Sequence, residues 1–229
     1  MIPNLHQCDY CSATFVNEKN LLKHSCKYKE RFEYITKKKK GVAMYSKYLY
    51  WLKKSGKSIK YVDEHTFIHS TQYNYFDRFL TFCSEKGIPD INLYIERMIK
   101  KDIIPQHWTR DDVLEHFLEY YDCDISPKIH ISKSVDTILR LSDALECETS
   151  DIFNELDNKT ILILLQSRKL SPWLLLNSAK FKEYLVKSAS AKERDYIQRH
   201  INPAKWKKIL DKNSKLLSDI RVILKEFGL

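Results

Sequence analysis

The sequence of 229 residues predicts a mainly α-helical protein, on three observations. Glycine and proline, which interrupt helices, are scarce, at 4 and 6 residues. Leucine, isoleucine, lysine and glutamate are abundant. Apolar residues recur three and four positions apart over most of the chain, which is the spacing of one face of an amphipathic helix. The N-terminal stretch is the exception, because cysteine and histidine set its pattern.

Four residues near the N-terminus have the types and spacing of ligands to one metal ion. Cys8 and Cys11 are separated by two residues, and His24 and Cys26 follow after twelve more as H-x-C. Thiolate and imidazole suit the borderline-soft character of Zn²⁺, which is usually tetrahedral in proteins. The sequence therefore predicts one zinc ion. A site closed by four protein ligands builds structure and leaves no position for an activated water.

The residues between these ligands strengthen the prediction. Phe15 stands four residues after Cys11, and Leu21 stands three before His24. Together with the ligands, the stretch resembles the Cys2His2 zinc-finger family, whose pattern is C-x2-C-x3-F-x5-L-x2-H. The resemblance implies a ββα-type module, with the cysteines on a hairpin, a small core of the aromatic residue and the leucine, and the histidine on a helix. Asn17 is the expected N-cap of that helix.

The fourth ligand departs from the family pattern. The family has three to five residues between its last two ligands, whereas only Ser25 separates His24 from Cys26. Residues two apart on a helix point about 200° apart, so both cannot reach one metal from an intact helix. Either the helix unwinds near His24, or His6 or a distant histidine completes the site.

The net charge of +9 is concentrated in one segment. Residues 19–60 contain 14 lysine or arginine residues and two acidic residues, whereas residues 61–229 are nearly neutral. This distribution predicts a polyanionic partner, DNA or RNA. A run of four lysines alone often forms a solvated linker, but beside a finger we interpret it as phosphate-binding. The predicted nucleic-acid-binding residues are Lys19, Lys23, Lys27, Lys29, Arg31, Lys37, Lys38, Lys39 and Lys40.

The predicted organisation has three parts: a zinc finger at 1–30, a basic linker with the first helix at 31–60, and a multi-helix domain at 61–229. Around Pro127 we expect a loop over 123–133, which is the candidate place for a subdivision. Helices are expected where capping residues and apolar spacing coincide. The expected ranges are 41–56, 71–86, 89–104, 109–121, 134–145, 149–156, 161–165, 171–176, 191–200 and 203–227, the last broken near 213.

The sequence shows no catalytic motif: no Gly-rich phosphate loop, nucleophile elbow or dinucleotide fingerprint. Asp111 and Asp112 invite a nuclease interpretation, but acids in a first helical turn are more simply partners of the helix dipole. His65 and His69 share a helical spacing, but no third metal ligand stands near them. We therefore expect a non-catalytic protein without a small-molecule substrate. The alternative left open is an enzyme acting on nucleic acid, because a helical fold can bring scattered acidic residues together.

The remaining features concern the setting of the protein. It has no secretory signal and no apolar run of membrane-spanning length, and Cys83, Cys123 and Cys147 lie far apart, as reduced intracellular thiols do. The layout resembles small zinc-finger proteins of large tailed bacteriophages, which implies a viral protein in the host cytoplasm but no activity. We expect a nucleic-acid-binding protein whose helical body binds a protein partner or more nucleic acid. The alternative is a protein-interaction or assembly factor that docks through the finger.

Overall fold

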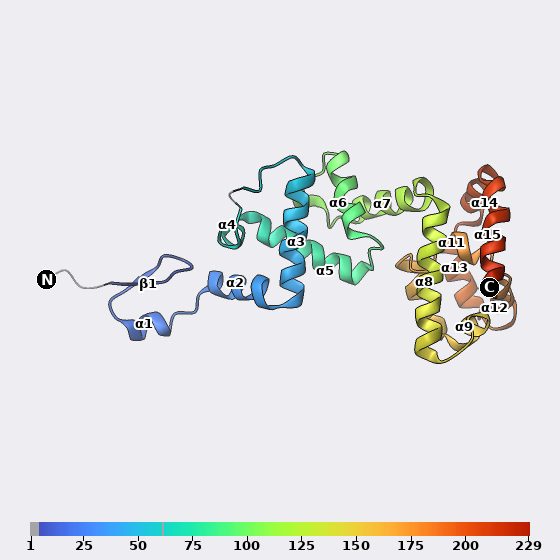
Figure 1. Ribbon diagram of the computed structural model, residues 1–229, viewed down its shortest axis with the longest axis horizontal. Helices are drawn as coiled ribbons and strands as arrows, with labels where there is room; N and C mark the ends of the chain where they lie inside the picture. The colour runs from blue at the N-terminus through green and yellow to red at the C-terminus, as the bar shows by residue number, and fades with distance from the viewer. Residues whose placement is uncertain (1–4, 61) are drawn as a thin grey trace. The chain divides into compact units, whose positions relative to one another are not determined.

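The structure, a computed structural model, describes residues 5–60 and 62–229. Residues 1–4 of the predicted finger and Tyr61 in the predicted helical domain lie outside the described residues. The described chain is mainly helical and has one two-stranded hairpin, which confirms the predicted fold class (Figure 1). The strands are β1 (His6–Gln7) and β2 (Thr14–Phe15), and the 3-10 helices are η1 (Pro105–His107) and η2 (Thr149–Asp151).

The chain divides into two compact units, Met1–Ser84 with Asp90–Leu114 (unit 1) and Glu85–Pro89 with Glu115–Leu229 (unit 2). The α-helices follow one another with short connections. They are α1 (Glu18–Leu22), α2 (Lys27–Lys37), α3 (Lys39–Lys54), α4 (Glu64–His69), α5 (Thr71–Lys86), α6 (Ile91–Lys100), α7 (Asp111–Asp124), α8 (Pro127–Leu145), α9 (Ile152–Glu155), α10 (Asn158–Gln166), α11 (Pro172–Leu175), α12 (Ala179–Lys187), α13 (Ala191–His200), α14 (Pro203–Lys212) and α15 (Ser214–Glu226).

Unit 1 begins with a small N-terminal module, residues 5–26, that has the predicted ββα order. The hairpin is antiparallel and pairs His6 with Phe15. Asn17 caps α1 as predicted, because its side chain accepts a hydrogen bond from the N–H of Asn20 at 2.9 Å. The module is therefore held by a hairpin and a capped helical turn.

The rest of unit 1 packs around buried aromatic side chains. Trp108 is fully buried and meets Phe79 edge-to-face, with ring centroids 4.9 Å apart. Its indole N–H donates to the carbonyl oxygen of Ile103 at 2.8 Å, so burial leaves no indole donor unpaired. Tyr48 and Trp51 of α3 also lie in this core, at 5 % and 7 % exposure. These two rings support the fold and do not face solvent.

The lysine run forms the junction of α2 and α3. Lys37 ends α2, Lys38 is extended, and Lys39 begins α3. Gly41, one residue after the run, is buried against the backbone of α2, where an added Cβ would lie 2.0 Å from the carbonyl oxygen of Tyr34. The close approach of the two helices therefore needs a residue without a side chain at this position.

Unit 2 packs its helices around a second core, in which Trp173 and Trp206 meet edge-to-face with centroids 5.4 Å apart. Ser134 lies buried within α8, and its hydroxyl accepts the N–H of Ser171 at 2.9 Å. Ser171 in turn caps α11, as the sequence predicts. In the described part of the chain no helix is long and apolar enough to cross a bilayer.

Two sequence expectations for unit 2 are wrong. Residues 123–133 are not a loop, because α7 runs to Asp124 and α8 starts at Pro127. Pro127 occupies the first turn of α8, where the missing N–H is unneeded, so it starts a helix instead of interrupting one. Ser134 consequently lies inside α8 and does not begin it. Helix α12, capped by Ser178, was not expected from the sequence. The predicted break of the last helix is confirmed at Asn213, between α14 and α15.

Candidate metal centre

The structure brings the four predicted ligands of the N-terminal module together. The ligand atoms of Cys8, Cys11, His24 and Cys26 all lie within 4.8 Å of one another. The Cys11 sulfur is 3.2 Å from His24 Nε2. Cys8 and Cys26 are 7 % and 4 % exposed, so two of the three thiols are nearly sealed from solvent. Three sulfurs and one imidazole nitrogen thus converge on one point.

The hairpin turn sets the first two ligands. The N–H of Cys8 donates to the carbonyl oxygen of Ala13, and the N–H of Ser12 donates to the carbonyl oxygen of Cys8, both at 2.9 Å. Ser12 closes the turn with a φ of 58°, in the left-handed region that L-residues seldom occupy. These bonds turn the chain sharply after Cys11, so that its thiol lies on the same side as that of Cys8.

The end of α1 positions the other two ligands, and it decides between the two alternatives that the sequence left open. Helix α1 ends at Leu22, and residues 24–26 are not helical. The expectation from the family resemblance that His24 lies on the helix is therefore wrong, because the helix ends before it. His24 and Cys26 can therefore face the same point although only one residue separates them. Among the described residues the fourth member of the cluster is Cys26 and not His6. Cys26 is also the N-cap residue of α2, which ties the centre directly to the helical body.

The electrostatics of the cluster favour a bound cation. Burial opposes ionisation of the Cys8 thiol, but hydrogen bonds from the backbone N–H groups of Tyr10 and Cys11 and from the thiols of Cys11 and Cys26 together lower the pKa of Cys8. The pKa of Cys11 is raised: the N–H of Ala13 favours its thiolate, but desolvation and the neighbouring Cys8 and Cys26 oppose it. Thiolates this close repel one another, so full ionisation needs a positive charge among them.

The cluster fits a tetrahedral metal ion. Metal–sulfur bonds of about 2.3 Å, the length usual for zinc, place sulfur ligands about 3.8 Å apart. The observed mutual separations, all within 4.8 Å, agree with one shared ion. The arrangement thus provides one metal site with four protein ligands. Within the described ranges it is the single group of three or more potential ligands found.

The turn between the first two ligands is docked on α4. Tyr10 lies between Cys8 and Cys11, and its carbonyl oxygen accepts a hydrogen bond from His69 Nε2 at 2.7 Å. The Tyr10 ring stacks on His65, with centroids 5.8 Å apart. The two histidines that had the spacing of metal ligands therefore hold the N-terminal module against the helical body. No sequence signal linked Tyr10 to residues more than fifty positions away.

A second set of contacts fixes α2 to the same place. Tyr28 stacks on His69 with centroids 3.9 Å apart. Arg31 donates to the carbonyl oxygen of Ile68 at 2.8 Å and to the side chain of Asn74 at 2.7 Å. Its guanidinium also lies 4.2 Å from the Tyr73 ring centroid. Arg31, predicted to contact nucleic acid, thus joins α2 to α4 and α5.

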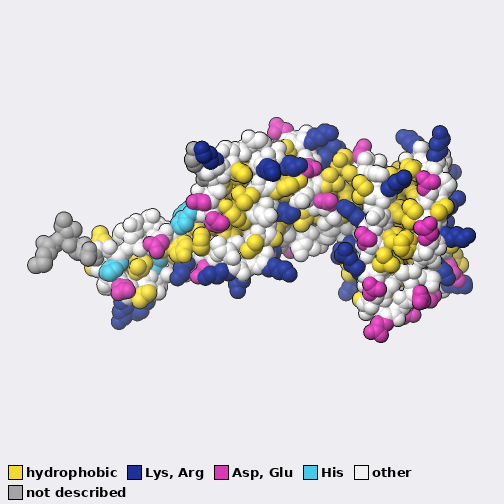
Figure 2. Space-filling model, viewed as in Figure 1, with side chains coloured by type: hydrophobic (Ala, Val, Ile, Leu, Met, Phe, Trp, Pro, Cys, Tyr) yellow, Lys and Arg dark blue, Asp and Glu magenta, His cyan; other side chains and the backbone are white. Residues whose placement is uncertain are grey.

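The other residues predicted to bind nucleic acid differ in whether they have hydrogen-bond or ion-pair partners within the chain. Lys37 pairs with Glu33 at 3.3 Å, and Lys40 donates to the hydroxyl of Thr81 at 3.1 Å. The remaining six are exposed and have no hydrogen-bond or ion-pair partner among the described residues: Lys19, Lys23, Lys27, Lys29, Lys38 and Lys39. Figure 2 shows basic side chains over α1 and along α2 and the start of α3. The lysine junction thus presents unneutralised positive charge, whereas the two lysines of the module are balanced in number by the exposed Asp9 and Glu18.

Comparisons with protein-family models, with curated proteins and with solved structures gave no significant match. The resemblances to the Cys2His2 family and to phage zinc-finger proteins therefore rest on the sequence pattern, and the geometry of the cluster supports the first.

Proposed function

We propose that the N-terminal module is a structural zinc finger and that it binds nucleic acid together with the exposed lysines of α2 and α3. Zinc is the ion that best suits three thiolates and one imidazole in a closed site. Its binding energy would stabilise a module whose strands have only two residues each. Metal analysis of protein purified without chelator should find about one zinc per chain. Its absence would refute this half of the proposal.

One observation carries the nucleic-acid half of the proposal: six exposed lysines without partners lie in the module, on α2 and at the junction of α2 and α3. Each lysine that approaches a phosphate releases condensed counterions, so binding of this kind weakens steeply with salt. Lysine contacts of this kind carry no sequence information. The surface therefore suits the backbone of DNA or RNA, with little base preference.

The test is the salt dependence of binding to labelled 20-bp duplexes and 20-nucleotide single strands. Replacing Lys38 and Lys39 by Gln should lower the slope of log K against log salt by about 2, since each phosphate contact contributes about 1. Replacing Lys100 and Lys101, two exposed lysines at the end of α6, by Gln is the matched control and should change the slope little. A flat slope for the unmodified protein, or equal effects of both pairs, would refute the proposal.

A second candidate function has an observation of its own. The N-terminal module exposes three large apolar side chains, Leu5 at 56 %, Val16 at 72 % and Leu22 at 78 %. Such side chains suit a protein partner, in line with a docking or assembly role. A partner captured from lysate after nuclease treatment, and lost on replacing Val16 and Leu22 by Ser, would support this function over nucleic-acid binding.

A further inference from the structure

Unit 2 has its own concentration of lysines, on α14 and the start of α15. Residues 203–215 hold five lysines and one acidic residue, whereas the rest of 115–229 holds 14 basic and 16 acidic residues. The basic excess of this unit is therefore confined to one short segment. The basic strip, as we call it, consists of the exposed residues Lys207, Lys208, Lys212 and Lys215.

The packing of the apolar side of α14 determines which of its residues are exposed to solvent. Trp206 is 2 % exposed and packs edge-to-face on Trp173, and Ile209 and Leu210 pack against the same core. At 3.6 residues per turn, Lys208 lies on the opposite side of α14 from these residues, and Lys207 and Lys212 lie on the two flanks, about 140° apart around the helix axis. The strip therefore stands on a packed helix and not on a mobile tail, so its charges stay together.

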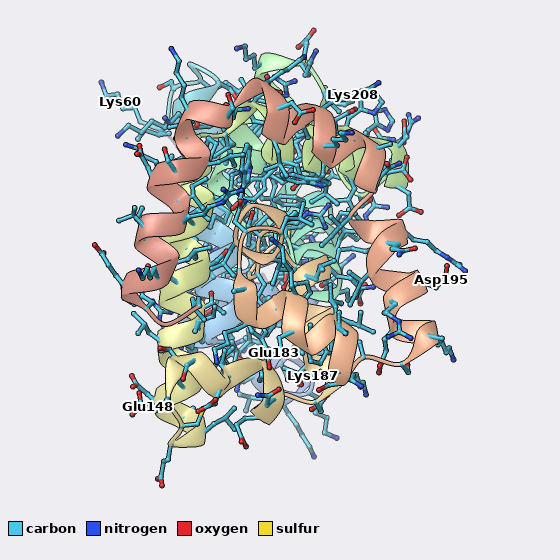
Figure 3. All side chains as sticks on the ribbon, turned by 90° about the vertical axis from the view of Figure 1, so that its right-hand side faces the viewer. Lys60, Glu148, Glu183, Lys187, Asp195 and Lys208 are labelled. Carbon is cyan, nitrogen blue, oxygen red and sulfur yellow. The ribbon has the colours of Figure 1, made fainter. Side chains whose placement is uncertain are left out.

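The lysines of the strip have no hydrogen-bond or ion-pair partner within residues 5–60 and 62–229, unlike several other cations of unit 2. Lys187 pairs with Glu183 at 2.6 Å, and the two side chains lie close together on α12 in Figure 3. Lys208, also labelled there, lies on α14 away from both. Lys205, beside the strip, reaches Glu119 at 3.7 Å. Asp211 lies one turn from Lys207 and Lys208, and Asp219 lies one turn from Lys215, but neither forms an ion pair with a lysine of the strip. The strip therefore keeps an excess of positive charge, which favours an anionic partner.

We propose that the basic strip is a second phosphate-binding surface, so that unit 2 contacts the same nucleic acid as unit 1; this rests on the proposed function. Lys207 and Lys212 are five residues apart, about 7.5 Å along the helix, over which a duplex presents about four phosphate charges. The strip contains four lysines and no arginine or exposed aromatic residue, so we expect it to contact the phosphates of the nucleic acid and not the base edges. Two such contacts on one chain add avidity when one strand or duplex can reach both.

The experiment compares two variants that each lose four positive charges from unit 2. The test variant replaces the four lysines of the basic strip by Gln. The control replaces four exposed lysines spread over other helices of the same unit, Lys128, Lys159, Lys182 and Lys192, by Gln. Binding of a labelled 40-bp duplex is measured from 50 to 300 mM salt, and circular dichroism checks that both variants are folded.

We expect the test variant to lower the slope of log K against log salt by about 2 to 4 and the affinity at 150 mM salt by tenfold or more. The control should lower the slope by less than about 1, because dispersed lysines make no shared contact. Equal effects of the two variants, or none from the test variant, would overturn the proposal. So would displacement of the duplex by polyglutamate at equal charge, which would assign the strip to an acidic protein.

The failure of this inference can be told apart from failure of the proposed function. If replacing Lys38 and Lys39 leaves the slope of log K against log salt unchanged while the strip variant lowers it, then the basic strip binds phosphate and the surface of α2 and α3 does not. The reverse result overturns the strip alone. If the unmodified protein binds neither duplex nor single strand, both proposals are wrong.

Discussion

Replacing Gly41 at the junction of α2 and α3 has two opposing effects on stability, a gain in helix propensity and a loss from overpacking. The sign of the net change shows which effect is larger. Gly41 lies inside α3, where replacing glycine by alanine usually stabilises a helix by about 1 kcal/mol. Its position against α2 reverses that expectation. An alanine Cβ at residue 41 would lie 2.5 Å from the carbonyl carbon of Tyr34 and 2.9 Å from the Cα of Ile35.

The magnitude follows from these distances. Carbon atoms in contact prefer about 3.5 Å, so the backbone of α2 would have to retreat by about 1 Å. Overpacking of this kind costs about 1–3 kcal/mol, and we expect the upper end because backbone atoms have no alternative rotamer. After subtracting the gain in helix propensity, Gly41→Ala should destabilise unit 1 by about 2 kcal/mol.

The assay is urea unfolding, with hydrogen exchange of the α3 amides to report on unit 1 separately from unit 2. Ala43→Gly, at an exposed position of the same helix, measures the propensity effect alone and should destabilise by about 1 kcal/mol. A Gly41→Ala variant that is as stable as the unmodified protein, or more stable, would refute the close approach of α2 and α3.

Four further predictions concern the metal centre and unit 2. Cys11→Ser, or chelation of the metal, should expose the amides of residues 5–26 to rapid hydrogen exchange while those of α5 stay protected. Ser12→Gly should stabilise the module by about 1 kcal/mol, because its φ of 58° suits glycine, and metal affinity measured by competition should not fall. Arg168→Leu should destabilise unit 2 by about 3–5 kcal/mol in urea, because it leaves Asp122 buried at 5 % exposure without the guanidinium that now pairs with both carboxylate oxygens at 3.0 Å. Burial lowers the pKa of His130 in the folded state, so the unfolded state takes up its proton at a higher pH. The free energy of unfolding should therefore be unaffected by His130 above about pH 6.5 and should fall as the pH drops below it. The same fall should be smaller in His130→Gln, which has no imidazole to protonate.

Much of the fold could be predicted from local sequence patterns. Helix α5 has its predicted bounds because a run of apolar residues at helical spacing ends at Gly87, where φ is +63°. Helix geometry showed that His24 and Cys26 cannot both reach one metal from an intact helix, since residues two apart point in different directions, but it left open whether the helix is interrupted or another histidine is the fourth ligand. Ligand types and spacing pointed to Cys8, Cys11 and His24, and the structure decided that Cys26 and not His6 joins them.

Tertiary structure decided everything that depends on residues distant in the sequence. Whether Pro127 ends one helix or starts the next is locally ambiguous, because proline suits both positions. The contact of His69 with Tyr10 joins residues 59 positions apart, so no pattern within one segment could predict it. The lysine run could equally have been a mobile linker. It forms a fixed junction because Gly41 lets α3 pack against the backbone of α2, and all four lysines of the run remain exposed on it.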